Sequence, residues 1–303
     1  MTQHHDSHDH GLAHDLPRML GRRRLLAVLG GLGLASASGT LAAAAECIAL
    51  PWETAGPYPA DGSNSNRAGD VVNVLKQEGI LREDLRASFG DDFSGDVDGV
   101  LLDLELTLLD AEGCTPLAGY AIYAWHCDGT GEYSLYDVTD ANWLRGLAVA
   151  DDEGKVKFTT IVPGCYPGRW PHIHFEIFKT AEKAVSGEAS ELTAQIALPE
   201  SVVGPIYSKD DRYGDSLTNL QANSISQDNV FGDNTDAEIE QQTLVMTGDS
   251  TEGYRGSVVI PVDFKADRTV SMAPPPGGMP PGGKPGDMPP PPGGQPPKKP
   301  GSE

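Results

Sequence analysis

Alternation of apolar and polar side chains constrains the fold of this chain more than any other feature. The run from Leu101 to Leu109 alternates in this way and leads into the turn Asp110-Ala111-Glu112-Gly113. A second alternating run, from Lys155 to Ile161, follows the turn Asp151-Asp152-Glu153-Gly154. A period of two turns one face of a strand toward a core and the other toward solvent. Short strands between turns rich in Gly and Asp predict an all-β chain folded as an antiparallel β-sandwich.

The other strand signals are short and are separated by polar segments. We expect further strands over residues 121–125, 173–178, 192–198 and 256–264, with 241–247 as an additional candidate. Helix signals are few, and the pattern favours one short helix over residues 80–88. The stretch 201–240 is polar and is expected to form loops. The predicted fold class is therefore an all-β antiparallel sandwich with long loops and little helix.

The two ends of the chain differ in composition from its middle. Residues 1–45 resemble an export signal, in which Arg22-Arg23-Arg24 precedes an apolar run and Ala42-Ala43-Ala44-Ala45 supplies small residues for cleavage. Paired arginines before such a run are typical of the twin-arginine route, with an ordinary secretory signal or a membrane anchor as alternatives. Residues 273–303 are dominated by Pro and Gly and are expected to form a disordered tail. One domain, residues 46–272, remains.

The charge of the chain narrows the choice of partners. The 44 acidic and 22 basic side chains give a formal net charge of −22. A surface of this sign disfavours nucleic acid and anionic membranes as partners. Once the signal is removed, no segment is apolar enough for stable membrane insertion. The sequence leaves the oligomeric state open.

Four cysteines follow the signal, at Cys47, Cys114, Cys127 and Cys165. An even number in an exported chain predicts two disulfides, for which three pairings exist. We favour Cys47–Cys114 together with Cys127–Cys165. A thiolate metal site is the alternative, but no Cys-x-x-Cys spacing supports it.

Two histidines one residue apart, His172 and His174, provide the clearest sign of chemistry. On a strand they share a face, and Ile173 and Phe175 then point into the opposite layer. Five of the 8 histidines precede residue 15, so the mature chain holds few imidazoles besides this pair. Two imidazoles that face the same way suit one metal ion, although two structural histidines are the alternative.

Phenols are the nearby candidates for oxygen ligands. Tyr133 and Tyr166 lie beside turns with Gly or Pro, and no Asp or Glu falls between Tyr166 and His174. A phenol ligates at neutral pH only when a strong Lewis acid removes its proton. Fe(III) does so readily, whereas Zn(II) and Mg(II) rarely use Tyr, so the donors predict non-haem ferric iron. Tyr136 is a rival to Tyr133 for this role.

Five ordered motifs, over roughly residues 46–262, resemble the intradiol ring-cleavage dioxygenases, the protocatechuate 3,4-dioxygenase and catechol 1,2-dioxygenase enzymes. The motifs are Thr54-Ala55-Gly56-Pro57-Tyr58, Trp125-His126-Cys127-Asp128 with Gly131-Glu132-Tyr133-Ser134, Pro163-Gly164-Cys165-Tyr166-Pro167, Arg169-Trp170-Pro171-His172-Ile173-His174-Phe175, and Leu192-Thr193-Ala194-Gln195-Ile196. Only five residues separate Tyr166 from His172, which resembles the exported, single-chain branch of the family.

The resemblance implies a role for each matching residue. The implied Fe(III) ligands are Tyr133, Tyr166, His172 and His174. The implied catalytic residues are Arg169, which stabilises charge on the substrate, Gln195 near it, and Tyr166, the axial ligand that leaves when substrate binds. The implied pocket wall is Gly56, Pro57 and Tyr58. His126 is expected to be structural or to support the ligands.

The function that this resemblance implies is an exported Fe(III) dioxygenase. It would insert O2 between the two hydroxyl-bearing carbons of a catechol and release a cis,cis-muconate-type product. The alternative is a non-catalytic β-sandwich binding module, or an inactive metal-binding relative. The resemblance implies a prealbumin-like sandwich, and binding modules of that fold share turns such as Asp152-Glu153-Gly154 but lack the His pair and the paired tyrosines. The particular catechol is not determined by the sequence.

Overall fold

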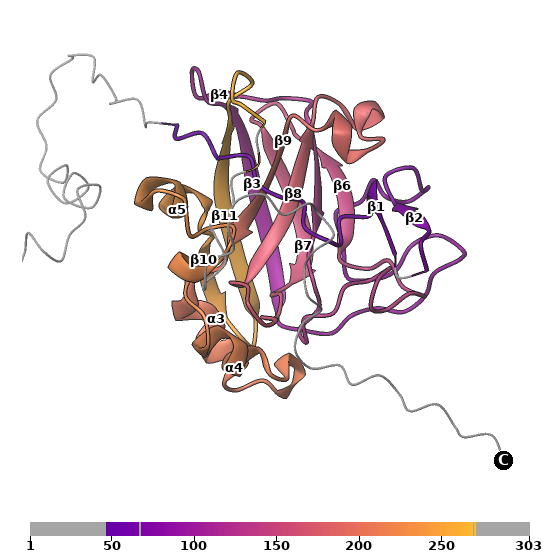
Figure 1. The fold of residues 1–303 in the computed structure, drawn as a ribbon, viewed down its shortest axis with the longest axis vertical. Helices are drawn as coiled ribbons and strands as arrows, with labels where there is room; N and C mark the ends of the chain where they lie inside the picture. The colour runs from indigo at the N-terminus through magenta and orange to yellow at the C-terminus, as the bar shows by residue number, and fades with distance from the viewer. Residues whose placement is uncertain (1–46, 67, 269, 271–303) are drawn as a thin grey trace, which may run out of the picture. The chain divides into compact units, whose positions relative to one another are not determined.

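A computed structural model describes residues 47–66, 68–268 and 270 of the chain (Figure 1). Its strands are β1 (Asp61–Ser65), β2 (Val71–Asn73), β3 (Leu101–Asp110), β4 (Thr115–Pro116), β5 (Ala121–Trp125), β6 (Arg145–Val149), β7 (Lys155–Ile161), β8 (His172–Phe178), β9 (Leu192–Ala197), β10 (Val245–Asp249) and β11 (Gly253–Val262). Its helices are α3 (Glu200–Tyr207), α4 (Ser216–Gln221), α5 (Asp236–Gln242) and the short 3-10 turns η1 (Ala181–Lys183), η2 (Gly187–Ala189), η3 (Asp211–Tyr213) and η4 (Ile225–Gln227).

The predicted chain ends lie outside the described residues. This applies to the export signal over 1–45 and to the tail over 273–303. The limits of the 46–272 domain therefore stay a prediction. Among the described residues, no helix is long and apolar enough to cross a membrane.

Two sheets form the sandwich. One has the strand order β6-β5-β8-β9, and its neighbouring strands are all antiparallel. The other has the order β10-β11-β3-β4, with β7 also paired to β3. The all-β sandwich is confirmed, with one departure from the expected antiparallel pattern, because β11 runs parallel to β3 from Tyr254 opposite Leu102 to Val262 opposite Asp110.

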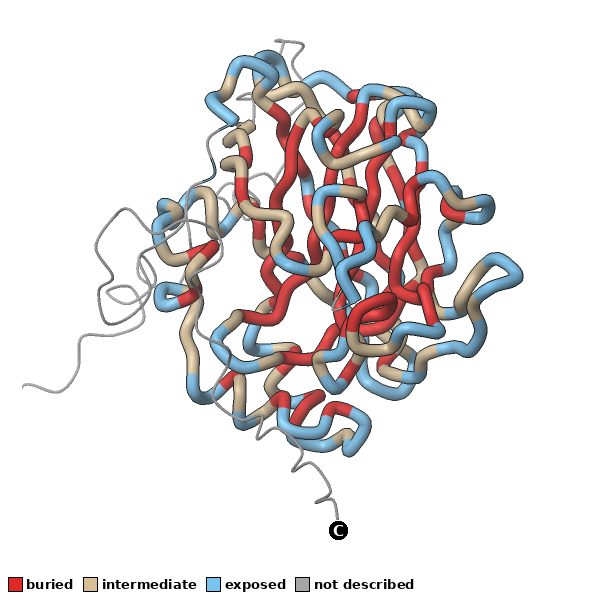
Figure 2. Tube along the Cα trace, turned by 45° about the vertical axis from the view of Figure 1, so that its right-hand side comes forward, coloured by how far each residue is buried: buried red, intermediate tan, exposed pale blue. Residues whose placement is uncertain are grey.

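The main core lies between the two sheets, and Figure 2 shows long buried stretches along the strands. Alternate residues of β3, from Leu102 to Leu108, point into it, as the sequence pattern predicted. Ile173 and Phe175 of β8 enter the same core from the opposite sheet. Because side chains alternate along a strand, His172 and His174 must point to the other face of that sheet.

That other face of the β6-β5-β8-β9 sheet is covered too. Every residue of β5 and β8 is buried, so neither strand has a solvent-facing side. The cover is a second apolar cluster, which Tyr123 and Trp125 of β5 share with Tyr133, Tyr136 and other loop residues. The His pair therefore lies between a sheet and loops, shielded from bulk water.

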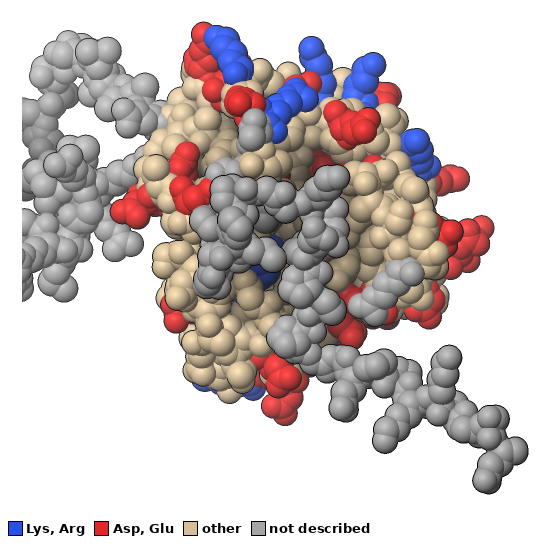
Figure 3. Space-filling model, viewed as in Figure 1, with Lys and Arg blue, Asp and Glu red and all other residues tan. Residues whose placement is uncertain are grey.

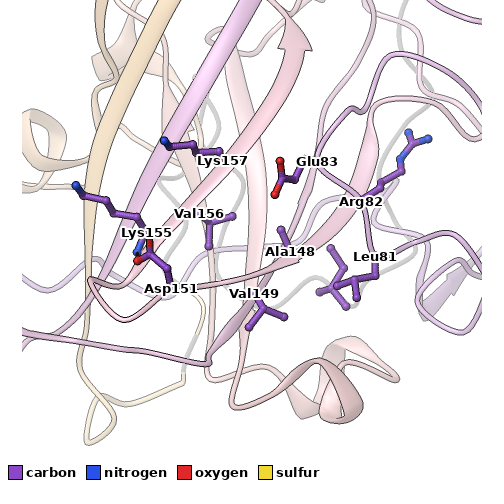
Figure 4. Close-up of a pocket in the computed structure, with 10 residues that line it drawn as sticks. Leu81, Arg82, Glu83, Ala148, Val149, Asp151, Lys155, Val156 and Lys157 are labelled. Carbon is purple, nitrogen blue, oxygen red and sulfur yellow. Dashed lines mark hydrogen bonds between the residues drawn. The ribbon is translucent and has the colours of Figure 1, made fainter.

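The helix predicted over residues 80–88 is wrong. The segment is extended and joins the edges of the two sheets, with bridges from Leu81 to Leu147 of β6 and from Asp84 to Thr159 of β7. Figure 4 shows the groove beside this join, where Leu81 faces Ala148 and Val149, while Lys155 and Lys157 lie across from them. Open strand edges offered more backbone hydrogen bonds than a short isolated helix could make internally.

The stretch 201–240 is less irregular than predicted. It contains most of α3, all of α4 and the first residues of α5. Helix α5 begins with a capping box, in which the Thr235 side chain accepts from the Glu238 backbone and the Glu238 carboxylate accepts from the Thr235 backbone. The candidate strand over 241–247 begins only at Val245, because its first residues complete α5.

Candidate active site

Two imidazole nitrogens meet on the covered face of β8. His172 Nε2 lies 2.9 Å from His174 Nε2. The Trp170 carbonyl can only accept a hydrogen bond, so His172 donates to it through Nδ1, at 2.5 Å, and Nε2 keeps a free lone pair. Burial, followed by the charge of Arg169, lowers the pKa of His172 to about 3, and burial also lowers the pKa of His174. Both rings are therefore neutral at pH 7, as metal ligands must be.

Two phenol oxygens complete the cluster. Tyr166 Oη lies 3.1 Å from His172 Nε2 and 3.4 Å from Tyr133 Oη. Burial raises the pKa of Tyr166 to about 12 even though Arg169 lowers it, and burial raises the pKa of Tyr133 well above its usual value. Both phenols keep their protons at neutral pH until a strong Lewis acid displaces them.

The four donors fit a metal of high charge. They form a chain of close contacts of 2.9, 3.1 and 3.4 Å that brings two nitrogens and two oxygens together. Among the described residues, no group of three or more His, Cys, Asp or Glu side chains could hold a metal ion. The His and Tyr donors are thus the candidate metal set, and phenolates favour a strong Lewis acid over Zn(II) or Mg(II).

Arg169 lies beside this cluster in a fixed setting. Its Nε donates to Asp228 Oδ2 at 2.9 Å, and its Nη2 donates to Gln195 Oε1 at 2.5 Å. Gln195 in turn donates to the Thr54 carbonyl at 3.0 Å. The structure therefore brings the predicted pair Arg169 and Gln195 into direct contact.

Asp228 was missed by the sequence analysis. It stands in the polar stretch taken as loop, 59 residues after Arg169, and its side chain is fully buried. No local pattern marks it, apart from the general rule that a buried arginine needs acceptors.

The predicted pocket wall passes over His174. Gly56 has φ +74°, and a Cβ there would lie 3.3 Å from His174 Cε1, so this position needs glycine. Tyr58 packs its ring 4.9 Å from that of Tyr133, while Pro57 is exposed. The Trp125 ring also stacks on the His174 ring, with the ring centroids 4.9 Å apart.

Tyr136 is not part of the donor cluster. Its hydroxyl donates to Asn64 and accepts from the Ala60 backbone, which leaves Tyr133 as the phenol beside Tyr166. Its ring lies 5.0 Å from the Tyr58 ring and so supports the pocket wall. His126 is likewise occupied elsewhere, with Thr160 Oγ1 and the Cys127 carbonyl at 2.7 Å each.

One of the two expected disulfides is present. Cys47 and Cys114 are bonded, as predicted. The expected Cys127–Cys165 bond is wrong, since both residues are free and buried. Each thiol instead faces a backbone carbonyl, with Cys127 Sγ 3.7 Å from the Gly164 oxygen and Cys165 Sγ 3.5 Å from the Arg169 oxygen.

Comparison with known protein sequences finds relatives for part of the chain. A family model described as Dioxygenase matches residues 83–183. A catechol 1,2-dioxygenase from Pseudomonas sp. (strain EST1001) is 32% identical over 97 residues, which is 32% of this chain and 29% of that protein. The chain thus matches less than a third of the length of this curated relative.

Solved structures share the fold over a larger part. An intradiol ring-cleavage dioxygenase from Tetranychus urticae is similar with a TM-score of 0.52 and 23% identity, covering 73% of this chain and 96% of that one. A crystal structure of another dioxygenase gives a TM-score of 0.54 and 24% identity, covering 73% and 97%. At these identities the likeness shows a common fold.

Proposed function

This chain belongs to the intradiol ring-cleavage dioxygenase family, and from that premise we propose that it cleaves catechols with non-haem ferric iron. The reaction would insert O2 between the two hydroxyl-bearing carbons and release a cis,cis-muconate-type product. The observation that carries the proposal is the meeting of Tyr133, Tyr166, His172 and His174 at one point on a covered sheet face.

The four donors would hold the iron. A bound ferric ion would supply Lewis acidity and a place for both catechol oxygens to chelate. Tyr166 is the less buried of the two phenols, since Tyr133 is only 1% exposed. We therefore assign Tyr166 the role of the donor that would give way to substrate, and its phenolate oxygen would then take up a proton released by the catechol.

Arg169 supplies fixed positive charge next to that position. Two of its three guanidinium nitrogens are engaged by Asp228 and Gln195. Among the described residues, no hydrogen-bond partner is found for the third, Nη1. This nitrogen is free to stabilise negative charge that develops on the substrate, in a site where little water weakens the interaction.

The segment Gly56-Pro57-Tyr58 would form one wall of the substrate pocket. Glycine at position 56 lets the backbone come close to the His174 ring, and Tyr58 lies against Tyr133. A flat aromatic substrate would then fit between this segment and Arg169. The proposed partners are a catechol and O2.

We also propose export, by the twin-arginine route, to the periplasm, the cell envelope or the medium. The Arg22-Arg23-Arg24 motif and the apolar run after it support export. The Cys47–Cys114 disulfide supports it independently, because such bonds persist in oxidising compartments. On the face drawn in Figure 3, acidic side chains lie around much of the edge, which disfavours nucleic acid as a partner.

The proposal is tested by reacting the iron-loaded protein with catechol and isotopically labelled O2. We expect one O2 to be consumed per catechol and both labelled atoms to appear in a ring-opened dicarboxylate. His172→Ala should abolish iron retention and product. His126→Gln, at another buried histidine, should retain both. Equal iron content in His172→Ala and the unaltered protein would contradict the ligand assignment, and an iron-loaded protein that leaves catechol intact would contradict the activity.

A further inference from the structure

The carboxylate partner of Arg169 has no part in the reaction as described so far. We infer that Asp228 is a positioning residue, which holds the guanidinium of Arg169 so that Nη1 faces the metal donors. The claim that Asp228 affects catalysis through Arg169 rests on the proposed function. The claim that Asp228 orients the Arg169 side chain rests only on the geometry of Asp228.

Asp228 has all of its acceptor capacity in use. Oδ2 accepts from Arg169 Nε at 2.9 Å and from the Trp170 backbone at 2.6 Å. Oδ1 accepts from the backbone of Val230 at 2.8 Å and of Phe231 at 3.2 Å. Burial disfavours the charged form, but Arg169 and the Trp170 backbone hold the pKa of Asp228 below its usual value. The carboxylate is therefore charged and fixed on both sides.

Gln195 fixes a second nitrogen of the guanidinium, Nη2. Gln195 is fully buried, and its amide nitrogen donates to the Thr54 carbonyl, so its oxygen must face Arg169. The Gln195 backbone oxygen is itself held by Gln242 at 3.3 Å. Asp228 on Nε and Gln195 on Nη2 determine the plane of the guanidinium and leave one edge open.

Arg169 also adjoins the metal donors directly, because its backbone nitrogen donates to the Tyr166 carbonyl at 3.4 Å. Asp228 also holds the Trp170 peptide, whose carbonyl orients the His172 ring. The Asp228 carboxylate thus positions both the Arg169 side chain and the Trp170 peptide that orients His172.

Asp228 also caps a local turn, and the experiment must separate that role from positioning. Serine at this place can accept from the backbone two or three residues on, as Asp228 Oδ1 does, but its side chain is too short to reach Arg169. Asp228→Ser therefore keeps the hydrogen bonds of the turn and removes the hydrogen bond to Arg169 Nε. Asp84→Asn is the matched control, because Asp84 holds Arg86 through two oxygens at an exposed position.

The first measurement is a cycle of Asp228→Ser, Arg169→Met and the double variant. We expect Asp228→Ser to lower kcat about 100-fold, since small misplacement of a catalytic group is costly. In the Arg169→Met background the same change should cost no more than about fivefold, because only the hold on the Trp170 peptide is then left to lose. Multiplying effects in the double variant would overturn the inference. Asp84→Asn should leave kcat unchanged.

The second measurement needs neither iron nor turnover. In the metal-free protein, the Arg169 Nε–H should give an NMR signal protected from exchange with water, identified by its absence in Arg169→Lys. We expect that protection to be lost in Asp228→Ser, and in Asp228→Asn should the serine variant not fold. A signal equally protected without the carboxylate would overturn the inference, whether or not the protein cleaves catechol.

Discussion

Two buried arginines lie close to the candidate site and are held in different ways. Arg145 is fully buried and makes four hydrogen bonds, to Ser134 Oγ, the Ser134 carbonyl, the Pro59 carbonyl and the Tyr123 hydroxyl. All of these acceptors are uncharged. Every guanidinium nitrogen of Arg145 is engaged, whereas Arg169 has a carboxylate partner and, among the described residues, one nitrogen without a hydrogen-bond partner.

Under the proposed function, this difference is that between a structural arginine and a functional one. Arg145 ties the loop that follows Tyr58 to the loop that carries Tyr133, because Pro59 and Ser134 are the next residues along each. Arg169 is held at Nε and Nη2, and we propose that its remaining nitrogen serves the site. Both arginines are buried, so what distinguishes Arg169 is the guanidinium nitrogen that has no hydrogen-bond partner among the described residues.

The largest expected effect is on the structural side of this comparison. Arg145→Met keeps the length of the side chain but removes the donor to two carbonyls and two hydroxyls, of which only the Pro59 carbonyl keeps another donor, the Tyr123 hydroxyl. Each unsatisfied buried group costs about 1–3 kcal/mol, so we expect the free energy of unfolding to fall by about 4 kcal/mol. Denaturant unfolding of the metal-free protein measures this change. A loss below about 1 kcal/mol would show that Arg145 does not hold the loops.

The next largest effect concerns how stability depends on pH through Glu53, a buried carboxyl whose pKa is influenced by Arg169. Glu53 is 1% exposed and accepts from Gln242 and Asn234, and burial raises its pKa to about 7. The pKa of Glu53 is therefore higher in the folded protein than in the unfolded chain. The folded state therefore binds more protons between about pH 4.5 and 7, and stability falls as pH rises through that window.

Glu53→Gln removes this titration. Relative to the variant, the unaltered protein should lose about 3 kcal/mol of stability from acidic to neutral pH and no more above it. Unfolding free energies of both proteins across this range provide the test. Parallel pH curves for the two would contradict the assignment.

The smallest of these effects on stability is expected at Arg169 itself. Arg169→Lys keeps the positive charge but loses the two guanidinium nitrogens that bind Asp228 and Gln195. We expect kcat to fall about 100-fold, while the free energy of unfolding falls by about 2 kcal/mol, because lysine can still pair with Asp228 but leaves the Gln195 oxygen without its donor. Steady-state kinetics beside denaturant unfolding, at equal iron content, would show it. A stability loss as large as that of Arg145→Met, with kcat unchanged, would reverse the roles assigned to the two arginines.

The sequence predicted the strands that show regular patterns. The ranges 101–109, 121–125 and 155–161 coincide with β3, β5 and β7 within one residue, and the His pair faces away from the main core. Strand β6 was missed because Arg145-Gly146-Leu147-Ala148-Val149 is buried on both faces and shows no alternation. Helix α5 had a readable signal, the Thr235 and Glu238 capping box, which was overlooked.

Long-range contacts limited the prediction of the site. Asp228 meets Arg169 across 59 residues, and Arg145 meets Pro59 across 86, so no local pattern indicates either contact. The Cys127–Cys165 bond failed for the same reason, because an even cysteine count cannot show where each sulfur points. Motif resemblance selected the donor residues, but only the folded chain shows which of them touch.

The measurement that tests the central claim most directly is the visible absorption spectrum of the iron-loaded protein, taken before and after catechol is added without O2. Tyr133 and Tyr166 bound to Fe(III) should produce a broad charge-transfer band and a red-brown colour. We expect that band to move to longer wavelength as catechol chelates. A protein that stays colourless with ferric iron, or a band that catechol leaves unchanged, would contradict the account.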